Sequence, residues 1–219
     1  MMYRIFAVVL FGFLGIPLIA QTPDRRFEAV VGGRTSPDKR AAIAIDFPSK
    51  MHRENTSSNG LGLCVFTSMH HAGKWQGVQA ITDFPQWMID KHITGGGHPA
   101  KVAELITRRC AELHIPEPHY IQFEGKDLEV FKLAVATGRM PCVTYSFSPT
   151  GRYNHQRIAH MVNLVHCDAD WVAVLDNNYI GDTQYEWMTP AEFQRTFTGG
   201  STGWGIVFLD AGPPPIPEN

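Results

Sequence analysis

The chain lacks a strong excess of charge of either sign, since 19 Lys and Arg stand against 21 Asp and Glu and the formal net charge is −2. Without a basic stripe, nucleic acid is disfavoured as the main partner. The chain also lacks an internal repeat, and low complexity is confined to the proline-rich tail GPPPIPEN. Because 44% of the residues are hydrophobic, the chain can bury one sizeable core. We expect one domain at residues 51–210, preceded by an extension at 21–50 and followed by a tail at 211–219.

Long apolar runs are also scarce, and only the N-terminal stretch MMYRIFAVVLFGFLGIPLIAQTP contains one. It has one arginine, then an apolar run, then Ala20 before a polar segment, which is typical of a secretory signal peptide at residues 1–20. The alternative is an uncleaved N-terminal membrane tether, although the run is short for a span of about 20 residues and Pro17 interrupts it. Both readings predict an extracytoplasmic protein, either secreted or periplasmic.

Motifs that hold metals or phosphates are missing as well. No HExxH or CxxC spacing occurs, and TGGGH lacks the strand–turn–helix context of a phosphate loop, so we interpret it as a turn. His70 and His71 are adjacent on a predicted helix and point in different directions, which disfavours a shared metal ion. We therefore expect no metal and no cofactor.

Hydrophobic periodicity changes along the chain, from helical spacing in the first half to β-rich runs in the second. Helices are predicted at 62–72, 83–93, 99–115, 126–138 and 189–197. Strands are predicted at 42–47, 118–123, 140–147, 159–167, 171–177 and 203–209. This order predicts an α+β fold with a helical N-terminal lobe and an antiparallel β-sheet C-terminal lobe. A cleft between two such lobes is a natural place for a site.

Cysteine is scarce too, with four in the chain. Cys110 shares an apolar helix face with Val102 and Leu105, so we expect it to pack in the core. If the strands that carry Cys142 and Cys167 pair antiparallel, the two cysteines can be cross-strand neighbours. A disulfide and two separate buried thiols both stay open for that pair.

The fourth cysteine, Cys64, lies at the N-terminus of the predicted helix in NGLGLCVFTSMHH. Unpaired amides and the helix dipole favour a thiolate there, although a packed core thiol is the alternative. His160 opens a strand after a polar loop and is the candidate base. Asp176 ends the next strand, so a hairpin can bring it beside His160 to orient the ring. Alternatives for the orienting role are Asn177 and Asn178, and the spare base is His155.

Taken together, GLGLCVFTSMHHA, AHMVNLVHCDADWVAVLDNN, MTPAEFQRTF and GWGIVFL resemble papain-like cysteine peptidases. The resemblance is closest to the C39-like group related to bacteriocin-processing peptidases, and it spans roughly residues 50–210. TGGGHPAKVAELITRRCAELHI and KDLEVFKLAVATGRMPCVTY are also similar to segments of that group. The resemblance implies a papain-like two-lobed fold, a peptide or protein substrate, and a triad of Cys64, His160 and Asp176.

Two positions depart from the family pattern. The family usually carries a glutamine about six residues before the cysteine, whose side chain helps to bind the oxyanion. Here that position is Ser58, and the adjacent Asn59 is our substitute donor because its amide can donate. Val65 and Phe66 replace the small residue and the aromatic residue that often follow the nucleophile.

The sequence therefore predicts a secreted thiol hydrolase, a cysteine peptidase that cleaves amide bonds. Two alternatives stay open. One is a catalytically silent papain-like fold that serves as an extracytoplasmic binding or assembly module. The other is a transglutaminase-like acyl transferase, because transfer to an amine uses the same three residue types.

Overall fold

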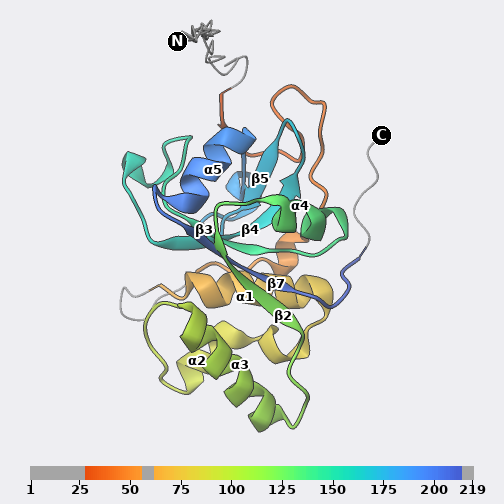
Figure 1. Ribbon diagram of the computed structural model, residues 1–219, viewed down its shortest axis with the longest axis vertical. Coiled ribbons are helices and arrows are strands. Elements are labelled where there is room, and N and C mark those ends of the chain that lie inside the picture. The colour runs from red at the N-terminus through yellow and green to blue at the C-terminus, as the bar shows by residue number, and fades with distance from the viewer. Residues whose placement is uncertain (1–27, 56–61, 214–219) are drawn as a thin grey trace, which may run out of the picture.

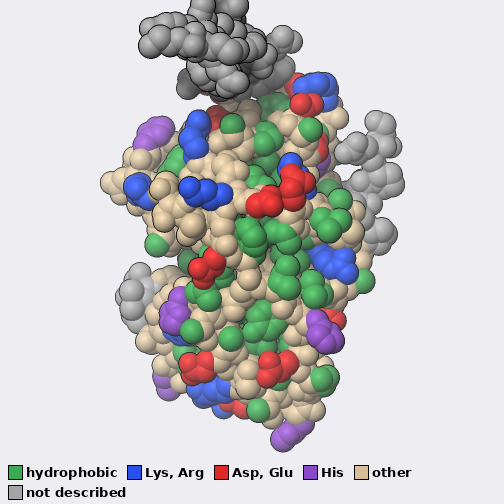
Figure 2. All heavy atoms as spheres, in the orientation of Figure 1, with side chains coloured by type: hydrophobic (Ala, Val, Ile, Leu, Met, Phe, Trp, Pro, Cys, Tyr) green, Lys and Arg blue, Asp and Glu red, His purple; other side chains and the backbone are tan. Residues whose placement is uncertain are grey.

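The computed structural model describes residues 28–55 and 62–213. The predicted signal peptide, Ser58, Asn59 and the end of the tail lie outside these residues. Within them, no helix is both long and apolar enough to cross a membrane. On the face drawn in Figure 2, acidic and basic side chains are interspersed, with apolar side chains between them.

A seven-stranded antiparallel sheet forms the centre of the molecule, in the order β1-β6-β5-β4-β3-β7-β2 (Figure 1). The strands are β1 (Val30–Val31), β2 (Tyr120–Gly125), β3 (Cys142–Tyr145), β4 (His160–Cys167), β5 (Val172–Leu175), β6 (Tyr185–Met188) and β7 (Gly203–Phe208). The middle strand, β4, is buried along nearly its whole length because helices pack on it from both sides.

Five α-helices accompany the sheet in the described part of the chain. They are α1 (Cys64–Gln76), α2 (Phe84–Asp90), α3 (Pro99–Leu113), α4 (Glu129–Ala136) and α5 (Pro190–Thr198). Helix α1 packs on β3 and β4 and is followed outward by α2 and α3, whereas α4 and α5 lie on the other side of the sheet (Figure 1). The predicted α+β class is therefore confirmed.

Local sequence explains where the helices begin. His98 accepts a hydrogen bond from the backbone N–H of Lys101 and caps α3, whose first residue is Pro99. Thr189 and Glu192 form a capping box at the start of α5. Cys110 lies on the buried face of α3, so its predicted place in the core is confirmed.

The predicted strand at 42–47 is wrong. Only Ala42 in this segment forms a bridge, with Thr35, although Ile43 and Phe47 are buried as their alternation predicts. The backbone N–H of Ile45 donates to the carbonyl of Val165 at 3.0 Å, at the point where the register between β4 and β5 shifts. The alternation of residues 42–47 therefore reflects which side chains are buried, and the segment does not pair as a strand of the sheet. The short strands β1 and β6 were not predicted.

The cysteines follow the register of the sheet. β3 and β4 do pair antiparallel, but Cys142 lies opposite Asn163 and not opposite Cys167. Cys167 lies opposite Val172 of β5 instead. All four cysteines are free, so the disulfide alternative for Cys142 and Cys167 is wrong.

The side chains of Gln76 and Trp75 hold the far end of α1 by hydrogen bonds. Gln76 Nε2 donates to the carbonyls of Phe208 at 3.0 Å and Asp210 at 2.6 Å, and its Oε1 accepts the N–H of Met140 at 3.0 Å. Trp75 Nε1 donates to the carbonyl of Gly138 at 2.8 Å. These bonds fix the position of the helix whose other end carries Cys64.

Candidate active site

Cys64 is the first residue of α1, and its surroundings favour an anion. No side chain caps this helix end, because the N-cap residue is Leu63 and the first turn has no acidic residue. The unpaired amides therefore face the sulfur with the positive end of the helix dipole. Cys64 is 7% exposed and lines a cleft, so the thiol is nearly buried at the cleft wall.

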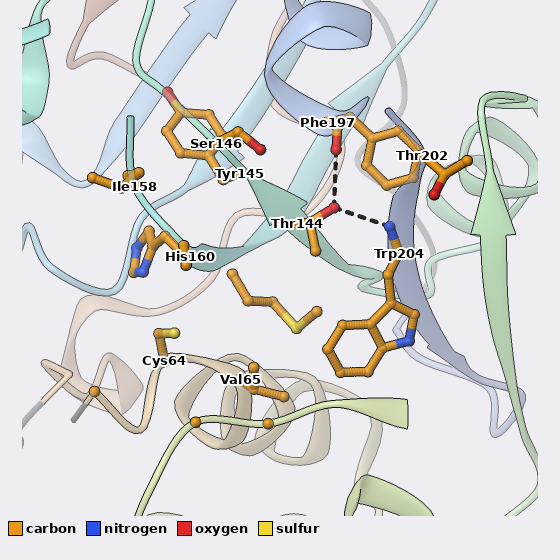
Figure 3. A pocket seen from close by; sticks show the side chains of 15 residues that line it. Cys64, Val65, Thr144, Tyr145, Ser146, Ile158, His160, Phe197, Thr202 and Trp204 are labelled. Carbon is orange, nitrogen blue, oxygen red and sulfur yellow. Dashed lines mark hydrogen bonds between the residues drawn. The ribbon is translucent and has the colours of Figure 1, made fainter. Parts of the chain in front are cut away.

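The structure brings His160 and Asp176 together beside this cysteine. His160 is the first residue of β4, and Asp176 directly follows β5, its antiparallel neighbour. His160 Nε2 lies 2.9 Å from Asp176 Oδ1. The Cys64 thiol interacts with the same ring, and because Nε2 faces Asp176, Nδ1 is the ring nitrogen left for the sulfur. Figure 3 shows the Cys64 and His160 side chains next to each other at one end of the cleft.

Opposing effects set the ionisation of this pair. Burial raises the pKa of the Cys64 thiol, but the hydrogen bond and charge of His160, with backbone amides, outweigh burial and hold the pKa below its ordinary value. Burial by itself lowers the pKa of His160, yet the hydrogen bond that the ring donates to Asp176, together with the neighbouring Cys64, raises it to about 9. Both shifts favour the pair of thiolate and imidazolium over the pair of neutral groups.

Asp176 has further hydrogen-bond partners besides His160. The Tyr153 hydroxyl donates to its Oδ2 at 2.7 Å, and Arg152 Nη1 donates to the same oxygen at 3.2 Å. The backbone N–H of Asn178 donates to Oδ1 at 3.0 Å. Burial raises the pKa of Asp176, but His160, the amide and Arg152 together lower it below the ordinary range. The fully buried carboxylate is therefore held ionised.

No protein-family model and no curated protein matches this chain.

The structure also places the two alternative orienting residues. Asn177 Nδ2 donates to the Cys64 carbonyl at 3.2 Å and to the Met161 carbonyl at 2.9 Å, so it joins α1 to β4. Asn178 Nδ2 donates to the Tyr153 hydroxyl at 3.1 Å. Neither is the partner found for His160, which is Asp176.

The cleft beside Cys64 has a volume of about 550 Å³. Its lining is largely apolar or neutral, and it includes Val65, Thr144, Met161, Phe197, Thr202 and Trp204. Thr144 Oγ1 joins two walls, since it donates to the Phe197 carbonyl and accepts from the backbone N–H of Trp204, both at 3.0 Å (Figure 3). Such a site suits an uncharged group next to the sulfur.

The glycine segment 94–97 forms another wall of this cleft, which the sequence did not predict. A Cβ on Gly97 would lie 2.6 Å from Val65 Cγ1, so only glycine fits this close approach. Lys101 Nζ donates to the carbonyls of Thr94 at 2.6 Å, Gly95 at 3.3 Å and Gly96 at 3.2 Å. One ammonium therefore holds the segment in place.

The other histidines singled out from the sequence lie elsewhere. His155 is exposed and lines a different hollow, so it is not the base at this cysteine. His71 accepts the N–H of Arg53 at 2.9 Å and contacts Asn163 Oδ1 at 3.1 Å, which uses both ring nitrogens. Within residues 28–55 and 62–213, no cluster of three or more His, Cys, Asp or Glu side chains is arranged to hold a metal ion.

The predicted oxyanion donors Ser58 and Asn59 lie outside the described residues. Sequence reasoning missed Arg152, Tyr153 and Glu186. Arg152 and Tyr153 sit in a polar loop with no local pattern to distinguish them, and they reach Asp176 only through the fold.

Proposed function

We propose that this protein is an exported thiol hydrolase of the papain-like, two-lobed type, similar to the C39-like group, and that it acts as a cysteine peptidase. The observation that carries the proposal is the arrangement of the Cys64 thiol, the His160 ring beside it and the buried carboxylate of Asp176, which lies 2.9 Å from His160 Nε2. A nucleophile, a base and an orienting group in this order are the parts that thiol-based acyl transfer needs.

The first step is attack on an amide carbonyl. The Cys64 thiolate forms a bond to the carbonyl carbon, and the C=O electron pair moves onto oxygen. In the proposed mechanism, the backbone N–H of Cys64, at the start of α1 without a side-chain cap, stabilises that oxyanion. In the proposed role, Asn59 or Ser58 supplies a second donor.

Collapse of this intermediate breaks the C–N bond. The imidazolium of His160 gives its proton to the leaving amine, and the acyl group stays on sulfur as a thioester. Neutral His160 then takes a proton from water, whose oxygen attacks the thioester and releases the carboxylic acid and the thiolate. Asp176 keeps the ring oriented and favours its charged form throughout.

The lining of the cleft favours a substrate whose group next to the scissile bond is uncharged. Apart from Cys64 and His160, the side chains that line it are apolar or neutral. A peptide is the substrate that the family resemblance implies, and export follows from the signal peptide that the sequence predicts.

Thiol alkylation tests the proposal without knowledge of the substrate. We expect iodoacetamide to label Cys64 at pH 6 at least about tenfold faster than a free cysteine, whose pKa is near 8.5. His160→Ala is expected to slow the labelling, and Cys64→Ala to abolish it at that peptide, as read by mass spectrometry. Cys110→Ala is the matched control, because that thiol is buried in α3.

Peptide libraries then distinguish the outcomes. Release of new amino termini by the wild type, and not by Cys64→Ala, supports a peptidase. Products joined to an added amine indicate acyl transfer instead. Labelling of Cys64 at the rate of a free cysteine would sink the enzyme proposal and leave the silent binding module.

A further inference from the structure

Behind Asp176 lies a second buried carboxylate, Glu186 of β6, which is fully enclosed. Its Oε1 accepts the hydroxyls of Ser148 at 2.5 Å and Thr150 at 2.6 Å, and the N–H of Thr150 at 3.2 Å. Its Oε2 accepts the Tyr145 hydroxyl. All four contacts are donors, which is the set that an ionised carboxylate accepts.

Arg152 lies between the two carboxylates. Its Nη1 is 3.2 Å from Asp176 Oδ2 and 3.9 Å from Glu186 Oε2, and its side chain is 4% exposed. Nη2 donates to the carbonyls of Thr183 and Tyr185, and the guanidinium lies 4.2 Å from the Tyr179 ring centroid. These contacts fix the cation against the rear of Asp176.

The loop that carries Arg152 is strained. Gly151 is left-handed, and the three residues after Arg152, namely Tyr153, Asn154 and His155, all have φ between 55° and 60°. Consecutive non-glycine residues in this region are unfavourable and persist where surrounding contacts hold them. Here the contacts that do so include the bonds from Arg152 and Tyr153 to Asp176.

We propose that Arg152 is a positioning residue of this site: shared between Asp176 and Glu186, it holds Asp176 in line with His160 and balances the second buried negative charge. This inference rests on the proposed function, because it concerns the ionisation of the same cysteine and histidine. Without Arg152, two buried carboxylates would face a single imidazolium, whereas without Glu186 the cation would act on Asp176 alone.

The groups that face this cluster come from several elements. They are His160 of β4, Cys64 of α1, Tyr145 of β3, Glu186 of β6, Tyr179 after β5, His52 before α1, and Arg152 and Tyr153 of the loop. Burial raises the pKa of the Tyr145 and Tyr153 hydroxyls further from neutrality, and burial lowers the pKa of His52 to about 4. These three therefore stay neutral around pH 7. The net charge of the cluster is set by Asp176, Glu186, Arg152 and the Cys64–His160 pair.

The test is the pH dependence of Cys64 alkylation in charge-matched variants. Arg152→Met makes the surroundings more negative, so thiolate formation and imidazolium loss should both move to higher pH, by about half to one unit. At pH 5 the alkylation rate should fall about three- to tenfold. Glu186→Gln removes a negative charge, so both the acid and the alkaline limb of the alkylation profile should move to lower pH. The new amide nitrogen can still donate to Tyr145, which keeps that contact.

The double variant, with Arg152→Met and Glu186→Gln together, should return the profile close to that of the wild type. Arg152→Lys should restore part of the effect, because it keeps the charge and loses the planar fork. If Arg152→Met does not fold, as an unbalanced buried acid can cause, Glu186→Gln decides the question alone.

Two failures are distinguishable. A wild-type profile like that of a free cysteine refutes the proposed function itself. A wild-type low-pKa thiol whose profile stays in place in Glu186→Gln, or moves to higher pH, refutes the role of Arg152 and leaves the proposed function standing.

Discussion

His160 Nε2 and Asp176 Oδ1 lie 2.9 Å apart, and the aspartate side chain has no exposed surface. A carboxylate so enclosed interacts with the imidazole through little intervening solvent, so its charge acts at close to full strength. The other donors on Asp176, from Tyr153, Arg152 and Asn178, keep that charge in place. The relationship makes the ionisation of the cysteine depend on a residue that it does not touch.

Replacing the carboxylate by an amide should therefore lower both reactivity and the alkaline limit. In Asp176→Asn the pKa of His160 should fall from about 9, because the raising hydrogen bond and charge are lost. The alkaline limb of the pH–rate profile should move down, and kcat/KM should drop about 10²- to 10⁴-fold. Asp168→Asn is the matched control. Asp168 Oδ2 lies 2.8 Å from His166 Nε2, and neither residue lines the cleft. An unchanged alkaline limb in Asp176→Asn would contradict this account.

Two of the glycines that line the cleft, Gly96 and Gly97, should respond differently to the same added methyl group. A Cβ at Gly97 would lie 2.6–2.9 Å from three atoms of Val65, whereas a Cβ at Gly96 meets nothing within 4 Å. Gly97→Ala should therefore displace Val65 at the cleft wall and reduce kcat/KM several-fold, while Gly96→Ala should stay near wild type. Steady-state kinetics on one peptide substrate measures both. Equal loss in the two variants would show that the close contact with Val65 does not matter.

Lys101 should affect substrate binding more than the chemical step. Lys101→Met removes the ammonium that holds the carbonyls of residues 94–96, so the wall should loosen. We expect KM to rise about three- to tenfold with kcat within about twofold, since the triad is untouched. Lys132→Met, which removes an exposed ion pair with Glu129, is the control. A fall in kcat with KM unchanged would assign Lys101 a different role.

His70 should make the fold sensitive to acid. Burial lowers its pKa to about 4, so the unfolded chain binds a proton more readily between about pH 6.5 and 4. Stability from this group is present above pH 6.5 and is lost as the pH falls. His70→Gln should reduce the loss of unfolding free energy between pH 7 and 4.5 by roughly 1 to 2 kcal/mol. Urea denaturation measures it, with exposed His119→Gln as the control. Parallel pH curves for His70→Gln and the wild type would remove His70 as the cause.

The sequence predicts best what depends on local pattern. Helix α3 and the capped start of α5 follow from periodicity and from Thr189 with Glu192. Strand β6 was missed because its segment, YEWM, is short and carries an acid in its interior. Glu186 is tolerated there only because Tyr145, Ser148 and Thr150 reach it from far along the chain.

At the candidate site, the sequence predicts the three residues that the structure brings together but not the residues around them. Cys64 and His160 can be recognised in the sequence because each is at the start of a predicted element, a helix for Cys64 and a strand for His160. The partner of Asp176 on its far side, Arg152, has no such mark, because its role depends on sheet order and loop conformation. The strand register that separates Cys142 from Cys167 is likewise set by the whole sheet.

The hydrogen bonds from Gln76 to Phe208 and Asp210 govern where a purification tag can be joined. Gln76 is bonded to the carbonyl of Asp210, and Gly212 lies so close to Trp75 and Gly138 that a Cβ there would clash. A tag that replaces residues 209–213 would release the distal end of the nucleophile's helix and disturb a reactive centre at its opposite end. A tag joined beyond residue 213 would keep the contacts of Asp210 and Gly212.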